Sequence, residues 1–111
     1  MADLHQTTVL PELEIEHHQD AHETVLVLRG EIDLASAPRL QLALANTFAA
    51  DPSRIVVDLA GVEFIDSTGL KCLIEARERA ADRSSLVLRH VPAQPRRLLE
   101  LTGLADVFVT D

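Results

Sequence analysis

V-E-F-I-D-S-T-G-L, residues 62–70, is the stretch around which this 111-residue chain is organised. An apolar run at residues 55–57 leads through Asp58, Leu59 and a short loop into D-S-T-G, residues 66–69. From Leu70 onward the apolar residues recur with a helical period. The stretch therefore predicts a strand that is followed by a helix beginning near Ser67.

Ser67 has two alternative roles at such a junction. Its hydroxyl can cap the helix, because the N–H groups of the first turn lack partners within the helix. It can also present that oxygen to a kinase, at a place where an added negative charge is felt strongly. The residues alone leave both roles open.

The composition indicates one globular domain with an aliphatic core. Apolar residues make up 47% of the chain and aromatic residues only 3%, with no Trp or Tyr. The core must therefore be built from Leu, Val, Ile and Ala. The scarcity of aromatic side chains also argues against a surface that stacks the bases of single-stranded nucleic acid.

The formal net charge of −8 makes nucleic acid and anionic membranes poor partners, because both are bound through basic surfaces. No apolar run approaches the ~20 residues of a membrane span, and the first residues lack the apolar core of a signal peptide. We therefore expect a soluble, cytoplasmic protein without direct membrane insertion. The single cysteine, Cys72, excludes an internal disulfide.

Residues 1–11 show little periodicity and are expected to form a flexible lead-in to a domain spanning residues 12–111. Alternation of apolar and polar residues predicts a strand at 13–16, and a second strand is predicted at 24–29. The polar segment 17–23 between them predicts a hairpin whose loop is too long for a tight turn.

A helix is expected from Ser36, with Ser36 as a capping hydroxyl and Pro38 in the first turn. The remaining predicted elements alternate along the chain: a strand at 54–59, a helix from 67 or 68 to about 82, a strand at 86–88, a helix from Pro95 closed by Gly103, and a strand at 107–109. The predicted fold class is α/β: one mixed sheet of about five strands, with three to four helices packed on it and a parallel strand–helix–strand unit at 55–88.

Two motifs, each after a predicted strand, carry a family resemblance: G-E-I-D at residues 30–33 and F-I-D-S-T-G-L at residues 64–70. With the V-x-D-L strand before the second motif, they resemble the STAS domain, in particular the bacterial anti-sigma factor antagonists. The order of elements matches that family over residues 13–109, and the run around Ser67 is the more specific of the two motifs.

The resemblance implies a phosphorylation switch. In that family the Ser after the Asp is phosphorylated by an anti-sigma factor that is itself a serine kinase with a histidine-kinase-like ATP fold. The unphosphorylated antagonist binds the anti-sigma factor and frees the sigma factor, and a PP2C-type phosphatase resets the phosphorylated form. Ser67 would be the phosphoacceptor, with Thr68 offering a second hydroxyl.

The other motif residues would form the partner-binding surface. The resemblance implies that Asp66 and Gly69 shape the turn of Ser67, and that Asp33, together with Glu31, lines the same surface. Physical reasoning supports the placement, because sites in open α/β sheets form beyond the carboxyl ends of the strands. Asp33 would lie close to Ser67 if its strand neighbours the strand at 55–59, although it could equally be a turn residue.

Other candidate sites are weaker. His5, His17, His18 and His22 suggest a metal site, but their spacing fits no tight ligand pattern and the segment is expected to be an exposed turn. Cys72 is expected to be a small, half-buried apolar residue. A helix N-terminus can lower a thiol pKa, which leaves redox sensing open, but nothing in the sequence supports that role. No nucleophile elbow and no glycine-rich phosphate loop is present, so we expect neither an enzyme nor a bound cofactor.

Two alternatives to the switch remain. A STAS domain can also serve as a small subunit docked on a membrane lipid transporter of the ABC type, where Ser67 would be a contact or a helix cap. A third function, nucleotide binding, would require ATP or GTP to raise the melting temperature.

Overall fold

The computed structural model describes residues 12–111 and shows a single α/β domain. Residues 1–11, predicted as a flexible lead-in, lie outside the described residues. The elements in chain order are β1 (Glu14–Gln19), β2 (Thr24–Ile32), α1 (Ala37–Ala49), β3 (Ile55–Ile65), α2 (Ser67–Arg79), the 3-10 turn η2 (Arg83–Ser85), β4 (Leu86–Arg89), α3 (Ala93–Leu101) and β5 (Val109–Thr110).

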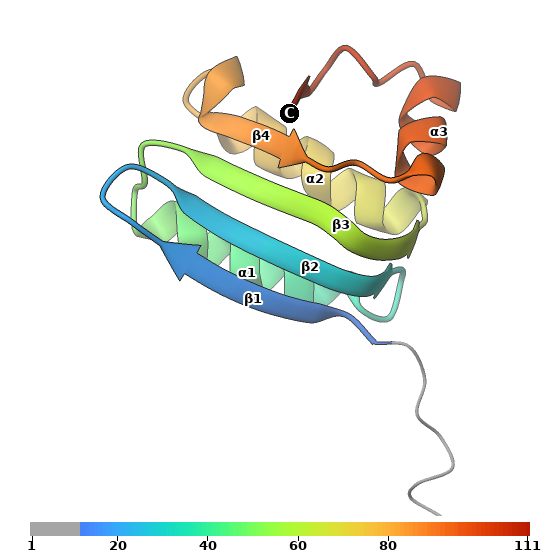
Figure 1. Cartoon of the computed structure of the whole chain (residues 1–111), viewed down its shortest axis with the longest axis horizontal. Helices are drawn as coiled ribbons and strands as arrows, with labels where there is room; N and C mark the ends of the chain where they lie inside the picture. Colours follow the sequence, from blue (N-terminus) through green and yellow to red (C-terminus); the bar gives the residue numbers. More distant parts are fainter. Residues whose placement is uncertain (1–11) are drawn as a thin grey trace, which may run out of the picture.

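The five strands form one mixed sheet in the order β1-β2-β3-β4-β5. β1 is antiparallel to β2, and every other neighbouring pair is parallel. The predicted fold class and the parallel β3–α2–β4 unit are therefore confirmed. In Figure 1, α1 and α2 lie side by side behind the sheet, whose other face is turned toward the viewer.

The core is aliphatic, as the composition predicts. The largest fully buried side chains are Leu13, Leu26, Leu28, Ile32, Leu40, Ile55, Leu59, Ile65, Leu73, Leu86, Leu88 and Val56. Phe108 is the one aromatic residue among the buried apolar residues of the described chain. All of these side chains except Val56 belong to one cluster beneath the helices.

The predicted hairpin is present, but its loop is shorter than expected. β1 continues to Gln19, so His17 and His18 lie in a strand and not in a turn, and only residues 20–23 form the loop. Asp20 makes this tight turn possible, because its Oδ1 accepts hydrogen bonds from the backbone N–H groups of His22 (2.7 Å) and Glu23 (2.9 Å).

The prediction of a loop after Leu59 was wrong, because β3 runs for 11 residues up to Ile65. β2 likewise continues beyond its predicted end to Ile32. Two register irregularities let these longer strands remain paired, one of them directly after Gly30. Gly30 has a φ of +107°, and a Cβ there would lie 2.0 Å from the carbonyl oxygen of Glu12, so only glycine fits.

Helix ends differ from the predictions in three places. Ser36 precedes α1 but makes no side-chain cap, since its hydroxyl belongs to the turn described below. α2 ends at Arg79 and not near Asp82, whose carboxylate caps η2 instead. α3 begins at Ala93, before Pro95, whereas its predicted end is correct: Gly103 has a φ of +75° and donates to the carbonyl of Glu100.

Candidate functional site

Ser67 is the first residue of α2, at the end of the central strand β3. The helix is capped by Asp66, which has an extended backbone and accepts a hydrogen bond on Oδ1 from the backbone N–H of Gly69 at 3.0 Å. The hypothesis that Ser67 is the cap was therefore wrong by one residue. Ser67 is exposed, and its hydroxyl makes no hydrogen bond to any residue of the described chain, 12–111.

Asp33 and Asp66 follow directly on two neighbouring parallel strands. Ile32 at the end of β2 pairs with Ile65 at the end of β3, and the backbone N–H of Asp66 donates to the carbonyl of Ile32 at 3.0 Å. The two Asp residues are thereby brought to the same edge of the sheet. The predicted proximity of Asp33 to the Ser67 turn follows from this register.

Asp33 also stabilises the turn between β2 and α1, the alternative role that its sequence position left open. Its Oδ1 accepts from the backbone N–H groups of Ala35 and Ser36, both at 3.0 Å. The hydroxyl of Ser36 accepts from the N–H of Asp33 at 2.9 Å and lies 2.8 Å from the carbonyl oxygen of Glu31. One carboxylate oxygen of Asp33 therefore holds the loop between β2 and α1, and Oδ2 has no hydrogen-bond partner among residues 12–111.

Gly69 is required by close packing under the turn. A Cβ at this position would lie 2.5 Å from Cγ2 of Ile32, 2.8 Å from Cγ1 of Ile65 and 2.9 Å from the carbonyl oxygen of Ile32. The first turn of α2 can thus rest directly on the ends of β2 and β3. This contact fixes the position of Ser67 relative to Asp33.

Gln94 fixes the strand end from the other side, and sequence reasoning missed it. Its Oε1 accepts from the backbone N–H of Ile65, and its Nε2 donates to the carbonyl of Ile65, both at 2.9 Å. β4 pairs with β3 only as far as Asp58 and Arg89. The side chain of Gln94, in the first turn of α3, therefore replaces a neighbouring strand at Ile65. The one sequence signal near Gln94 is the helix start predicted at the neighbouring Pro95.

Two exposed apolar side chains lie close to the turn residues in the sequence, and neither was predicted as a site residue. Leu34, next to Asp33, is 74% exposed, and Phe64, two residues before Asp66, is 40% exposed. Thr68 is half-buried and lines a hollow with Leu34 and Lys71, whereas Ser67 does not line it. The more accessible hydroxyl of the two is that of Ser67.

The remaining candidate residues lie elsewhere. His17 and His18 are on β1, where Nε2 of His18 lies 2.7 Å from a carboxylate oxygen of Glu16, and His5 lies outside the described residues. Residues 12–111 contain no group of three or more His, Cys, Asp or Glu side chains arranged to hold a metal ion.

Cys72 is buried between α1 and α2, with its Sγ 3.7 Å from the carbonyl oxygen of Ala37. Burial raises the pKa of its thiol above the ordinary value, and the carboxylates of Glu75 and Asp66 raise it further. A thiol in this environment is a weak nucleophile. The expectation of half-burial underestimated how deeply this residue lies.

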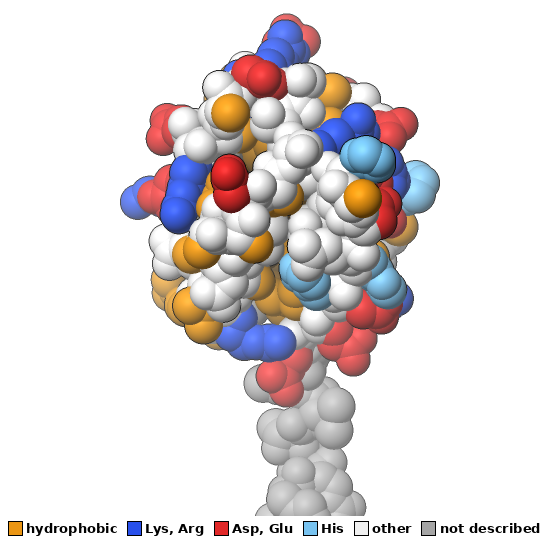
Figure 2. Space-filling model, turned by 90° about the vertical axis from the view of Figure 1, so that its left-hand side faces the viewer, with side chains coloured by type: hydrophobic (Ala, Val, Ile, Leu, Met, Phe, Trp, Pro, Cys, Tyr) orange, Lys and Arg blue, Asp and Glu red, His pale blue; other side chains and the backbone are white. Residues whose placement is uncertain are grey.

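The surface shows no continuous basic region on the face in view in Figure 2, at the end of the molecule that carries the β1–β2 loop. Lys and Arg side chains are dispersed there among Asp and Glu. No helix of residues 12–111 is long and apolar enough to cross a membrane.

Comparison with known proteins gives consistent similarities. A family model described as "Mlab, STAS domain" matches residues 15–110. The anti-sigma-F factor antagonist RsfB of Mycobacterium tuberculosis is 36% identical over 84 residues, covering 76% of this chain and 69% of that protein. The anti-sigma-B factor antagonist of Listeria monocytogenes is 34% identical over 97 residues, covering 86% and 84%. The crystal structure of an anti-sigma factor antagonist from Mycobacterium paratuberculosis has a TM-score of 0.83 at 30% identity, covering 89% and 85%.

Proposed function

This chain belongs to the STAS-domain family of anti-sigma factor antagonists, and from that premise we propose that it binds an anti-sigma factor and so releases a sigma factor. We propose further that this partner is a serine kinase, that it phosphorylates Ser67, and that phosphorylation ends the binding. In this proposal the protein acts in the cytoplasm as a binding protein without enzymatic activity of its own.

The observation that carries the proposal is the free hydroxyl of Ser67 at the start of α2. Asp66 supplies the cap, so Ser67 is not needed to complete the helix. Its side chain is exposed, whereas that of Thr68 is half-buried against the hollow beside Leu34. Ser67 is therefore the phosphoacceptor of choice. The kinase would transfer the γ-phosphoryl group of ATP to Oγ, its own base would take the hydroxyl proton, and ADP would leave.

The surroundings of Ser67 favour a switch that acts on the interface and not on the fold. A phosphate adds a charge of about −1.5 to −2 at neutral pH. The N-terminus of α2 stabilises that charge by roughly 0.3–1 kcal/mol. Four acidic residues, Glu31, Asp33, Glu63 and Asp66, belong to the same edge of the sheet and oppose it. The two effects offset each other within the domain.

A bound partner would experience the phosphate differently. A protein packed over Leu34 and Ser67 would bury the phosphate without a matching cation. An unpaired charge in an interface costs several kcal/mol, enough to weaken binding about a hundredfold or more. A PP2C-type phosphatase would restore binding by hydrolysing the Ser67 phosphate ester, with release of inorganic phosphate.

The alternative is a subunit of a membrane lipid transporter. The chain matches a STAS-domain family model over residues 15–110, and the sequence resemblance leaves this role of STAS domains open. The same exposed Leu34 and Phe64 could then contact a transporter subunit, with Ser67 as an unmodified contact residue.

The decisive measurement is the intact mass, with mapping of the modified residue, of protein purified from its native host with and without stress. The proposal expects one phosphate on Ser67, and the phosphorylated fraction should decrease when the stress response is induced. The added mass should be absent from Ser67→Ala and present in Thr68→Ala. An unmodified protein in every condition would refute the switch.

The partner can be identified by capture with two variants of Ser67. Ser67→Ala should capture the anti-sigma factor, which can be identified by mass spectrometry and then expressed alone, and Ser67→Asp should capture much less of it. Capture of a permease and its ATPase by both variants would favour the transporter subunit. A rise in melting temperature on addition of ATP or GTP would favour nucleotide binding.

A further inference from the structure

A groove runs along the seam between α1 and α2, away from the Ser67 turn. Its first hollow, of about 180 Å³, is lined by residues that include Leu34, Ala37 and Thr68. A second hollow of about 200 Å³ continues it and is lined by residues that include Ala45, Phe48, Ala76 and Arg79. Gln41, Cys72 and Glu75 border both hollows.

Small residues cause the groove. The two helices meet through Ala37, Ala45, Cys72 and Ala76, whose side chains do not fill the space between the helix backbones. Three of these four are buried and form the floor, whereas Ala45 is half-buried at the rim.

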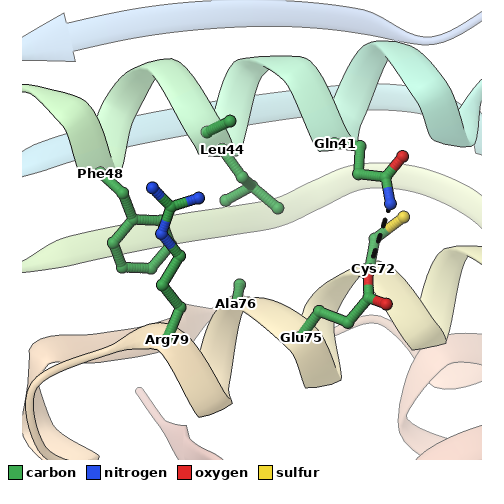
Figure 3. A pocket seen from close by; sticks show the side chains of 8 residues that line it. Gln41, Leu44, Phe48, Cys72, Glu75, Ala76 and Arg79 are labelled. Atoms are coloured by element: carbon green, nitrogen blue, oxygen red, sulfur yellow. Dashed lines mark hydrogen bonds between the residues drawn. The ribbon is translucent and has the colours of Figure 1, made fainter.

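Polar and charged side chains close the groove from above. Nε2 of Gln41 donates to Oε1 of Glu75 at 3.3 Å, and Figure 3 shows this hydrogen bond crossing in front of Cys72. At the far end, the guanidinium of Arg79 lies 5.0 Å from the centre of the Phe48 ring. All of these closing side chains except Phe48 are exposed, so they can be displaced by a bound segment.

The groove is continuous with the surface around Ser67. Thr68 and Leu34, which line the first hollow, are the immediate neighbours of Ser67 and Asp33. A protein that covers Ser67 and the 74% exposed Leu34 therefore already reaches the mouth of the groove. This continuity indicates that the partner bound at the Ser67 surface also occupies the groove.

We propose that the groove between α1 and α2 receives an apolar side chain of the anti-sigma factor, as a second contact beside Ser67. This inference rests on the proposed function. It adds the groove as a second surface that contributes to the affinity for the anti-sigma factor. An apolar side chain placed between Ala45 at the rim and Ala76 on the floor would be buried against small residues. Its flanking polar groups would meet Gln41 and Glu75 at the rim.

The proposal separates two roles within one interface. Phosphorylation acts at Ser67, while the groove contributes burial that is independent of the charge on Ser67. Full burial of one aliphatic side chain corresponds to about a ten- to a hundredfold gain in affinity. Filling the groove should therefore weaken binding by about that factor without changing the exposure of Ser67.

The first test fills the groove with Ala45→Trp and uses Ala49→Trp as its matched control. Ala49 is the last residue of the same helix, is exposed and lines neither hollow. The probe is the anti-sigma factor captured with Ser67→Ala and purified, titrated by calorimetry. We expect Ala45→Trp to bind at least about tenfold more weakly than Ala49→Trp. Equal affinities of the two variants would overturn the proposal.

The second test needs no substitution and so does not depend on folding of Ala45→Trp. Alanine methyl groups of the wild-type chain are labelled and followed by NMR as the same purified partner is added. The methyl signals of Ala45 and Ala76 report on the groove, that of Ala35 beside Asp33 reports on the Ser67 surface, and that of Ala49 is the control.

The outcomes distinguish this proposal from the proposed function. Shifts at Ala45, Ala76 and Ala35, with Ala49 unchanged, support the groove contact. Shifts at Ala35 alone refute it and leave the Ser67 interface standing. Absence of any binding by the unphosphorylated protein refutes both.

Discussion

Replacing Gln94 with Ala should destabilise the domain through the strand end that carries Ser67. The substitution removes both 2.9 Å hydrogen bonds to Ile65, whose backbone has no neighbouring strand on that side. Ile65 is only 2% exposed, so water replaces the lost partners poorly. An unsatisfied buried backbone group costs about 1–3 kcal/mol. Because Gln94 is itself half-buried, we expect the lower part of that range for each group, about 2 kcal/mol in total.

Urea unfolding and thermal melting measure this loss directly. For a domain of this size, about 2 kcal/mol corresponds to a melting temperature lower by about 8–16 °C. Gln94→Glu tests the cause, because a carboxylate can accept from the Ile65 N–H but cannot donate to the Ile65 carbonyl. Gln94→Glu should lose about as much unfolding free energy as Gln94→Ala, since a carboxylate oxygen would face the Ile65 carbonyl oxygen and repel it. The control is Arg97→Ala, at an exposed position of α3. A Gln94→Ala variant as stable as Arg97→Ala would refute the reasoning.

Three further predictions concern the same turn and its helix. Gly69→Ala should destabilise the protein by about 1–3 kcal/mol in urea unfolding, because the added methyl group would lie within 3 Å of Ile32 and Ile65; a stabilisation, as helix propensity alone would give, would contradict the packing argument. Asp66→Ala should cost about 1 kcal/mol as a lost cap, whereas Ser67→Ala should change stability by less than about 0.5 kcal/mol; the reverse order would restore Ser67 as the cap. Because burial raises the pKa of Cys72 in the folded state, its contribution to stability is complete below the thiol's unfolded pKa of about 8.5 and is lost as the pH rises above it. Cys72→Ala should therefore flatten the alkaline decline of the melting temperature, and an unchanged decline would contradict this cause.

Much of the fold follows from local patterns. The order of strands and helices, the parallel unit around α2 and the aliphatic core are all predicted by periodicity and composition, because each pattern reports on burial within one segment. Element ends are less predictable. Nothing local shows that β3 continues to Ile65, since that continuation depends on the register with β2 and on the irregularity next to Gly30.

The candidate site is likewise predictable only where its signal is local in the sequence. Asp33 and Ser67 are found from their motifs because a turn after a strand has a strong local signature. The identity of the cap is decided by backbone angles, since Asp66 and Ser67 are both good capping residues and lie side by side. Gln94 is 29 positions from its partner Ile65, so only the packing of α3 on the end of β3 brings them together.

The placement of the cap has a consequence for the proposed switch. If Ser67 were the cap, phosphorylation would remove an oxygen that the helix needs, and the domain itself would change. With Asp66 as the cap, a phosphate on Ser67 would lie at the start of α2, where Asp66 uses only the N–H of Gly69 and the other free N–H groups of the first turn remain available to an anion. The domain would therefore tolerate both states of Ser67 with little difference in stability. Nearly all of the free energy of the added charge would then be expressed in the affinity for the partner, as a two-state interaction signal requires.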